Sequence, residues 1–206
     1  ALPILSRRLD PDLTFEVTSD ARAALTGVDY IITTIRAGGD AGRLFDEQTC
    51  LAHGVLGQET TGAGGFAMAI RSVPTLVYYC TLAREVANPG HLIFNFTNPS
   101  GIITQALRSK GFDNVYGICD APSGFIKQLE EILEIPYGTL DIECYGLNHL
   151  SWFRNAKVNG RDVQRELLDN PRTYEHSEMR LFTREMARIS GDCMLNEYLR
   201  SEERRV

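Results

Sequence analysis

Apolar residues occur along this chain in two patterns, short continuous runs and longer segments with an apolar residue every three or four positions. The runs predict strands and the longer segments predict helices, because side chains repeat every 2.0 residues in a strand and every 3.6 in a helix. Three runs, at 29–35, 91–97 and 114–119, are continuous rather than alternating. Continuous apolar strands are typical of parallel sheets that are buried on both faces.

Segments with helical spacing separate these runs. Helices are predicted over 20–25 (capped by Ser19), 43–53, 66–88, 102–107 and 125–133, with a kink or break near Pro74, and a weak pattern at 14–17 predicts a short strand. Strands that alternate with helices build parallel βαβ units. The predicted fold class is therefore α/β, a doubly wound parallel Rossmann-like sheet of the lactate/malate dehydrogenase kind.

The pattern changes after Asp141. Segments 141–145 and 151–158 predict strands, and Asn159-Gly160 predicts a hairpin turn to the segment that follows. Helical signals fill much of the remainder. We therefore expect residues 1–144 to form the Rossmann-like domain and residues 145–206 to form the beginning of a second, α+β domain.

Two expected features are missing from this pattern. No GxGxxG turn joins a first strand to a helix, although the remaining strands are typical of the later part of a dinucleotide-binding sheet. The second domain also has only its opening elements. We therefore expect the chain to be an internal portion of a longer protein.

Composition and charge narrow the class of partner. Lys and Arg total 21 against 27 Asp and Glu, a net charge of −6, which does not favour nucleic acid or an anionic membrane as partner. No apolar run approaches the roughly 20 residues of a membrane helix, and no signal-peptide pattern opens the chain. Five cysteines without a CxxC pair argue for a reducing compartment, which we take to be the cytoplasm.

Polar residues follow two of the predicted parallel strands. Asn98 precedes Pro99, and Asp120 follows Cys119, so these side chains lie at the carboxyl ends of strands, where open α/β sheets bind ligands. Asn98 could clamp a polar substrate or only form an Asx turn before the proline. Asp120 could act as an acid or only cap the next helix.

Cys119 and His149 are the leading candidates for metal ligands. A thiolate and an imidazole could share one ion, and two protein ligands suit a catalytic ion with open positions. A buried structural cysteine and a hydrogen-bonded turn histidine would explain the same residues. Arg36 and Arg43 flank a glycine loop and could hold an anionic group, or they could be solvated surface arginines. Nothing in the periodicity distinguishes Tyr198 from the other tyrosines.

Seven short motifs occur in a consistent order between residues 14 and 155. They are Thr34-Ile-Arg-Ala-Gly-Gly39, Arg43 with Asp46-Glu47, His53-Gly-Val-Leu-Gly-Gln-Glu-Thr60, Gly64-Gly65, Asn95-Phe-Thr-Asn-Pro99, Gly117-Ile-Cys-Asp120 and Tyr145-Gly-Leu-Asn-His-Leu150. Together they resemble glycoside hydrolase family four, whose members are NAD- and metal-dependent 6-phospho-glucosidases, α-galactosidases and α-galacturonidases.

The resemblance implies NAD and a divalent metal, usually Mn²⁺, as cofactors, and a sugar or sugar phosphate as substrate. It assigns the metal to Cys119 and His149. It implies catalytic roles for Asp120 and for Tyr198, whose match in Leu195-Asn-Glu-Tyr-Leu-Arg200 is loose. The remaining implied contacts are Arg43, Asn98 and Asn148 to the substrate, and Ile35, Arg36 and Asn95 to NAD.

The activity that the resemblance implies is hydrolysis of O-glycosidic bonds, first of all in 6-phospho-β-glucosides. It proceeds by NAD-mediated oxidation at C3, deprotonation at C2 by a tyrosine base and elimination at C1, with the metal polarising the sugar oxygens. Alternatives within the family are 6-phospho-α-glucosides and α-galacturonides. A lactate/malate-type dehydrogenase and an inactive fragment are alternatives of another class, and the full-length protein is expected to be a homodimer or homotetramer.

Overall fold

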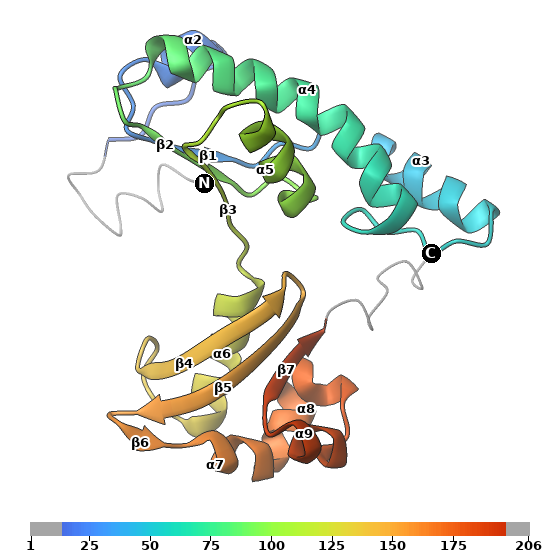
Figure 1. The fold of residues 1–206 in the computed structure, drawn as a ribbon, viewed down its shortest axis with the longest axis vertical. Coiled ribbons are helices and arrows are strands. Elements are labelled where there is room, and N and C mark those ends of the chain that lie inside the picture. The colour runs from blue at the N-terminus through green and yellow to red at the C-terminus, as the bar shows by residue number, and fades with distance from the viewer. Residues whose placement is uncertain (1–13, 197–206) are drawn as a thin grey trace.

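The computed structural model describes residues 14–196, and they form two lobes joined by the segment between β3 and α6 (Figure 1). The first lobe contains α2–α5 and β1–β3, and the second contains α6–α9 and β4–β7. The segment at 14–17, predicted as a strand, is not one; Phe15 and Val17 are exposed there.

The first lobe is built on a parallel sheet of three strands in the order β1-β2-β3. The strands are β1 (Tyr30–Thr33), β2 (Leu92–Asn95) and β3 (Val115–Gly117). Thr33 pairs with Asn95, and Asn95 pairs with Gly117, so the carboxyl ends of all three strands are level. This arrangement confirms the predicted Rossmann-like α/β class and places the loops after the three strands at one edge.

The described helices of this lobe are α2 (Ala21–Leu25), α3 (Gly39–Ala52), α4 (Gly62–Val86) and α5 (Ser100–Ser109). Asp20, rather than Ser19, caps α2, because its carboxylate accepts from the backbone N–H groups of Arg22 and Ala23. Both α3 and α4 begin earlier than the apolar pattern predicted. Of the predicted kink or break at Pro74, the break is wrong, since α4 continues through the proline.

Only one face of the sheet is covered by the described residues. Ile31, Ile93 and Val115 pack with α4 and α5 into one hydrophobic core. On the other face Tyr30 is 71% exposed, and its ring stacks 6.5 Å from that of Phe94. The expectation that both faces are buried is therefore wrong for residues 14–196.

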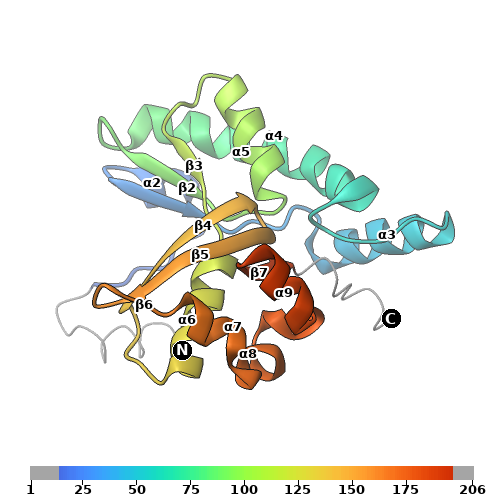
Figure 2. The same ribbon diagram turned by 60° about the horizontal axis from the view of Figure 1, so that its bottom comes forward.

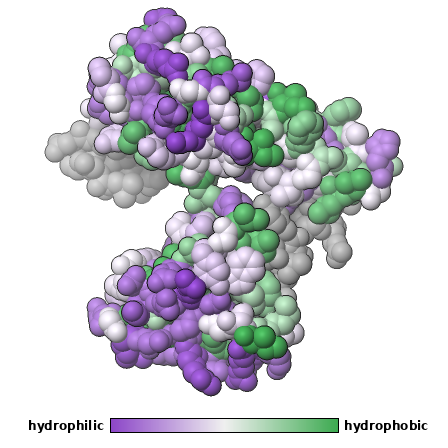
Figure 3. All heavy atoms as spheres, in the orientation of Figure 1, coloured by the Kyte–Doolittle hydropathy of each residue, from purple (hydrophilic) through white to green (hydrophobic). Residues whose placement is uncertain are grey.

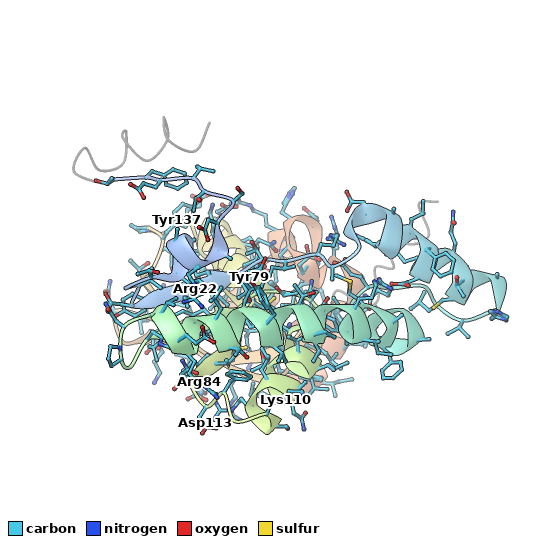
Figure 4. All side chains as sticks on the ribbon, turned by 90° about the horizontal axis from the view of Figure 1, so that it is seen from above. Arg22, Tyr79, Arg84, Lys110, Asp113 and Tyr137 are labelled. Carbon is cyan, nitrogen blue, oxygen red and sulfur yellow. The ribbon has the colours of Figure 1, made fainter. Side chains whose placement is uncertain are left out.

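By length and composition alone, α4 could cross a membrane. In this fold it runs the length of the first lobe, with α2 beside one end and α3 beside the other (Figures 1 and 4). Its buried side chains, among them Leu76 and Cys80, belong to the core of the first lobe. Apolar side chains also gather on the surface over α3 and the adjoining half of α4 (Figure 3), where Phe45, Phe66 and Ile70 are exposed.

The second lobe is an antiparallel sheet packed against helices. Its strands are β4 (Leu140–Leu147), β5 (Leu150–Val158), β6 (Arg161–Asp162) and β7 (Cys193–Asn196), and β5 pairs with each of the other three. The predicted hairpin at Asn159-Gly160 is confirmed as the β5–β6 turn. The helices are α6 (Ala121–Leu133), α7 (Gln164–Asp169), α8 (Pro171–His176), the 3₁₀ helix η1 (Glu178–Leu181) and α9 (Arg184–Ser190).

The packing of α6 decides where the lobes divide. Phe125 and Leu129 of α6 join Phe153 of β5 in the core of the second lobe, and the Phe125 and Phe153 rings lie 4.8 Å apart. The predicted boundary between residues 144 and 145 falls inside β4. A division before α6 follows the two cores, because α6 follows the parallel sheet in sequence but packs on the antiparallel one.

Candidate functional site

The candidate site lies where the level ends of β1, β2 and β3 face the β4–β5 turn. Figure 2 shows the tip of this hairpin reaching toward the first lobe. A cleft of about 840 Å³ opens between α5 and the hairpin, and its lining includes Cys119 and Asn148. The hollow between the lobes is also seen in the space-filling view (Figure 3).

Cys119 and His149 meet at this junction. They are 30 positions apart in the chain, yet the Cys119 Sγ lies 3.3 Å from the His149 Nε2. Two ligands of one divalent ion stand about 3 to 4 Å apart, given the usual metal–ligand bond lengths. The sulfur and the ring nitrogen therefore fit a shared ion. Among residues 14–196 there is no cluster of three or more His, Cys, Asp or Glu side chains that could hold a metal ion.

The surroundings of Cys119 favour its thiolate. Burial raises the pKa of the thiol, but hydrogen bonds from His149, the Ala121 N–H and the Asn148 side chain, with the charge of His149, lower it further, so the net pKa is below the usual value. The pKa values of two other cysteines are raised instead. Burial raises the pKa of Cys80 to about 11 and that of Cys193 to about 12. Since a thiolate is the form that binds metals, Cys119 is the better suited ligand of these three.

The turn that carries His149 holds it in an uncommon conformation. The histidine joins β4 to β5 with a φ of +60°, in the left-handed region that favours glycine. The neighbouring Gly146 has a φ of +112°, and a Cβ there would lie 2.9 Å from the Trp152 ring. The hairpin is thus shaped so that the imidazole points back to the end of β3.

Asp120 and Asn148 flank the pair. Asp120 is the N-cap residue of α6, but its side chain makes no capping hydrogen bond. Its Oδ1 lies 3.9 Å from the Cys119 sulfur instead. The side chain therefore does not make the capping hydrogen bond that the sequence left open.

A second group of polar side chains gathers at the ends of β1 and β2. Arg36 forms an ion pair with Glu59. Arg43 Nε lies 2.6 Å from Glu47 Oε1 and 3.6 Å from Glu59 Oε2, and Asn98 Nδ2 lies 3.5 Å from Glu59 Oε1. The side chains of Arg36 and Arg43 are only 37% and 29% exposed. Arg43 is thus half-buried, whereas Arg36 is exposed but held in an ion pair.

Glu59 is the residue of this site that the sequence did not identify. It contacts two arginines and an asparagine that come from three different segments. Its segment, residues 54–65, is rich in glycine, which favours close approach of the backbone to another group. The structure shows that this group is the protein itself: a Cβ at Gly64 would lie 2.5 Å from the Gln58 carbonyl oxygen. A charged residue between Gly57 and Gly62 was the feature of the sequence that could have identified Glu59.

Asn95 and Ile35 lie beneath the site. Asn95 is fully buried; its Oδ1 accepts from Thr33, and its Nδ2 donates to Thr104 Oγ1 and to nearby carbonyl oxygens. This side chain joins β1, β2 and α5, which disagrees with the predicted contact of Asn95 to a cofactor. Ile35 is half-buried, and its N–H donates to Thr97 Oγ1. Tyr198 lies outside the described residues.

The level strand ends, the paired thiol and imidazole and the arginine group together define a class of protein. It is a Rossmann-like α/β protein with a polar site at the carboxyl edge of its sheet. Residues 2–135 match the family described as "Family 4 glycosyl hydrolase". This match covers more than half of the chain, so the chain belongs to glycosyl hydrolase family 4.

Curated relatives include glycosidases for both anomers. The 6-phospho-β-glucosidase BglT of Thermotoga maritima is 37% identical over 166 residues, which are 80% of this chain and 40% of the relative. The 6-phospho-α-glucosidase 1 of Lacticaseibacillus paracasei is 34% identical over 166 residues, 79% of this chain and 37% of the relative. The chain thus spans about 40% of the length of these relatives.

Solved structures show the same fold. The Thermotoga maritima 6-phospho-β-glucosidase with manganese, NAD⁺ and glucose-6-phosphate has a TM-score of 0.78 at 34% identity, over 94% of this chain and 46% of that one. A 6-phospho-α-glucosidase from gut microorganisms, in complex with NAD and Mn²⁺, has a TM-score of 0.77 at 30% identity, over 97% and 49%.

Proposed function

We propose that this chain is the metal-holding part of an NAD- and Mn²⁺-dependent 6-phospho-glucosidase. The observation that carries the proposal is the 3.3 Å approach of Cys119 Sγ to His149 Nε2 at the carboxyl edge of the sheet. Relatives of both anomeric types and neighbouring structures that contain NAD, Mn²⁺ and glucose-6-phosphate support it. Membership of the family favours this function over a lactate/malate-type dehydrogenase.

The residues of the chain divide the work between them. Cys119 and His149 hold the divalent ion, while Asn98, Arg43 and Asn148 bind the sugar phosphate. Arg36 and Ile35 contact the cofactor at the end of β1. The bound cofactor supplies reversible hydride transfer, and the bound ion supplies a Lewis acid beside the sugar oxygens.

Proton transfer falls to two further residues. Tyr198 removes the proton from C2 of the sugar, and Asp120 assists the departing group at C1, which its position 3.9 Å from the Cys119 sulfur supports. In the full-length enzyme we expect Tyr198→Phe to lower kcat about a hundredfold or more, with little change in affinity for the sugar phosphate.

Between the two anomers, the proposed substrate is a 6-phospho-β-glucoside. The family relatives include both anomeric types, so the choice is a matter for assay. We place the enzyme in the cytoplasm, since a thiolate ligand is sensitive to oxidation, and we propose a homodimer or homotetramer as its assembly.

The test uses the full-length enzyme with NAD, Mn²⁺ and a thiol. Release of p-nitrophenol from its 6-phosphorylated β- and α-glucosides is compared, with and without a chelator. We expect turnover of the β-glucoside that the chelator abolishes and that Cys119→Ser reduces by at least about a hundredfold. If only the α-glucoside is turned over, the proposed preference for the β-anomer is wrong. If neither substrate is turned over, or if the chelator has no effect on turnover, the proposed function is wrong.

A further inference from the structure

Arg71 of α4 lies beside the arginine group and links three segments. Its guanidinium donates to both carboxylate oxygens of Asp46 in α3. Its Nε donates to the carbonyl oxygen of Ala37, in the loop after β1, at 3.4 Å. The Asp46 side chain is only 6% exposed and that of Arg71 is 32% exposed, so the ion pair is partly buried. A bidentate arginine–carboxylate pair fixes the relative orientation of its two partners as well as their distance.

The backbone of the loop is shaped to lie against this guanidinium. Gly38 has a φ of +85°, and a Cβ built there would lie 3.2 Å from the Arg71 Nε. A Cβ at Gly42 would lie 3.5 Å from the same atom. Gly38 thus lets the loop approach the guanidinium closely, and a side chain there would press on it, whereas a Cβ at Gly42 would make an ordinary contact.

Each of the two site arginines lies close in sequence to a residue that Arg71 holds. Arg36 immediately precedes Ala37, and Arg43 lies one helical turn before Asp46 on α3. Arg36 also pairs with Glu59, and Arg43 pairs with Glu47. Any shift of the loop or of α3 on α4 therefore moves both guanidinium groups relative to the strand ends.

We propose that Arg71 is a positioning residue that sets the places of Arg36 and Arg43 without itself touching a ligand. The proposal rests on the proposed function, in which those two arginines bind cofactor and substrate. It predicts that weakening the Arg71 contacts impairs NAD and sugar-phosphate binding but leaves the metal pair of Cys119 and His149 intact.

The main test compares three variants of the full-length protein with wild type. Arg71→Lys keeps the charge but loses the paired hydrogen bonds. Arg71→Met removes the charge, and the exchange of Arg71→Asp with Asp46→Arg restores an ion pair in reversed order. Binding of NAD, glucose-6-phosphate and Mn²⁺ is measured by calorimetry, and thermal unfolding is followed in parallel.

We expect Arg71→Lys to weaken NAD and glucose-6-phosphate binding about tenfold or more, because displacements near 1 Å are costly at polar sites. Mn²⁺ affinity should stay within about twofold of wild type. The double variant Arg71→Asp with Asp46→Arg should recover the unfolding temperature but not the affinities for NAD and glucose-6-phosphate. An ion pair that only stabilised the fold would not produce this difference. The control is Arg22→Met, which removes the ion pair to Glu85 at the end of α4 away from α3 (Figure 4) and should change no affinity.

Hydrogen exchange of the ligand-free protein separates this proposal from the proposed function. Amides of residues 37–42 should exchange faster in Arg71→Lys, while those of β2 stay unchanged. If wild type binds neither NAD nor the sugar phosphate, the proposed function fails and the exchange rates still decide the role of Arg71. The positioning role of Arg71 would be contradicted by any of three results in Arg71→Lys. These are unchanged hydrogen exchange at residues 37–42, unchanged NAD and glucose-6-phosphate affinities, or an equal loss of Mn²⁺ binding.

Discussion

The backbone of Gly57 lies directly against that of Glu47. A Cβ built at Gly57 would be 2.5 Å from the Glu47 carbonyl oxygen and 2.9 Å from its Cα. This contact holds the loop that carries Glu59 against α3. The side chain of the same Glu47 accepts a hydrogen bond from Arg43. A glycine here is required by space rather than by backbone conformation.

We therefore expect Gly57→Ala to displace the Glu59 loop. Backbone atoms closer than a normal contact cannot yield cheaply, so the free energy of unfolding should fall by about 1 to 3 kcal/mol. Urea unfolding measures this change. The control is Gly124→Ala in α6, where nothing lies within 4 Å of an added Cβ. That variant should gain about 0.5 to 1 kcal/mol of stability, and equal losses for the two would contradict the packing argument.

The second prediction concerns thiol reactivity in the metal-free protein. Because the net pKa of Cys119 is lowered, more of it is thiolate at a given pH, so iodoacetamide should alkylate it at lower pH than Cys80 or Cys193. Those two thiols, with pKa values of about 11 and 12, should react only after unfolding. Peptide mass spectrometry across a pH series reads out each site.

Two additions sharpen this measurement. Mn²⁺ should protect Cys119, and His149→Ala should move its alkylation to higher pH, because burial then raises the pKa without an imidazole to oppose it. Exposed Cys144 serves as the accessible reference on the same molecule. Labelling of Cys119 no earlier than the buried pair would show that the imidazole does not act on the thiol.

The third prediction separates backbone strain from metal binding at His149. A residue other than glycine in the left-handed region costs about 1 to 2 kcal/mol, and His149 has a φ of +60°. His149→Gly should therefore be about 1 kcal/mol more stable than His149→Ala in metal-free urea unfolding. Both variants should lose Mn²⁺ binding by calorimetry. If the two variants have equal free energies of unfolding, the backbone at residue 149 is not strained.

The fourth prediction tests whether Asn95 is part of the scaffold. Asn95→Ala should lower the free energy of unfolding by about 3 kcal/mol, since Thr33 and Thr104 then lose a buried partner. Asn88→Ala, at the opposite end of the strands, removes hydrogen bonds to Gly27 and Asp29 near the surface and should cost about 1 kcal/mol. A variant of Asn95 that kept full stability but lost NAD binding would restore the predicted cofactor contact.

Much of this protein follows from local patterns in its sequence. The alternation of apolar runs with helical segments determined the parallel sheet, because strand and helix bury side chains with different periods. The order of short motifs determined the family. The glycines of residues 54–65 are visible in the sequence, but the groups that their backbones approach are not.

Only the tertiary structure decided how the remote residues combine. It brought Cys119 to His149, gave Asn95 to the scaffold rather than to a ligand, and placed Glu59 between two arginines. It also assigned α6 to the second core. These outcomes depend on how elements distant in the chain pack and pair, and no local period or propensity encodes such contacts.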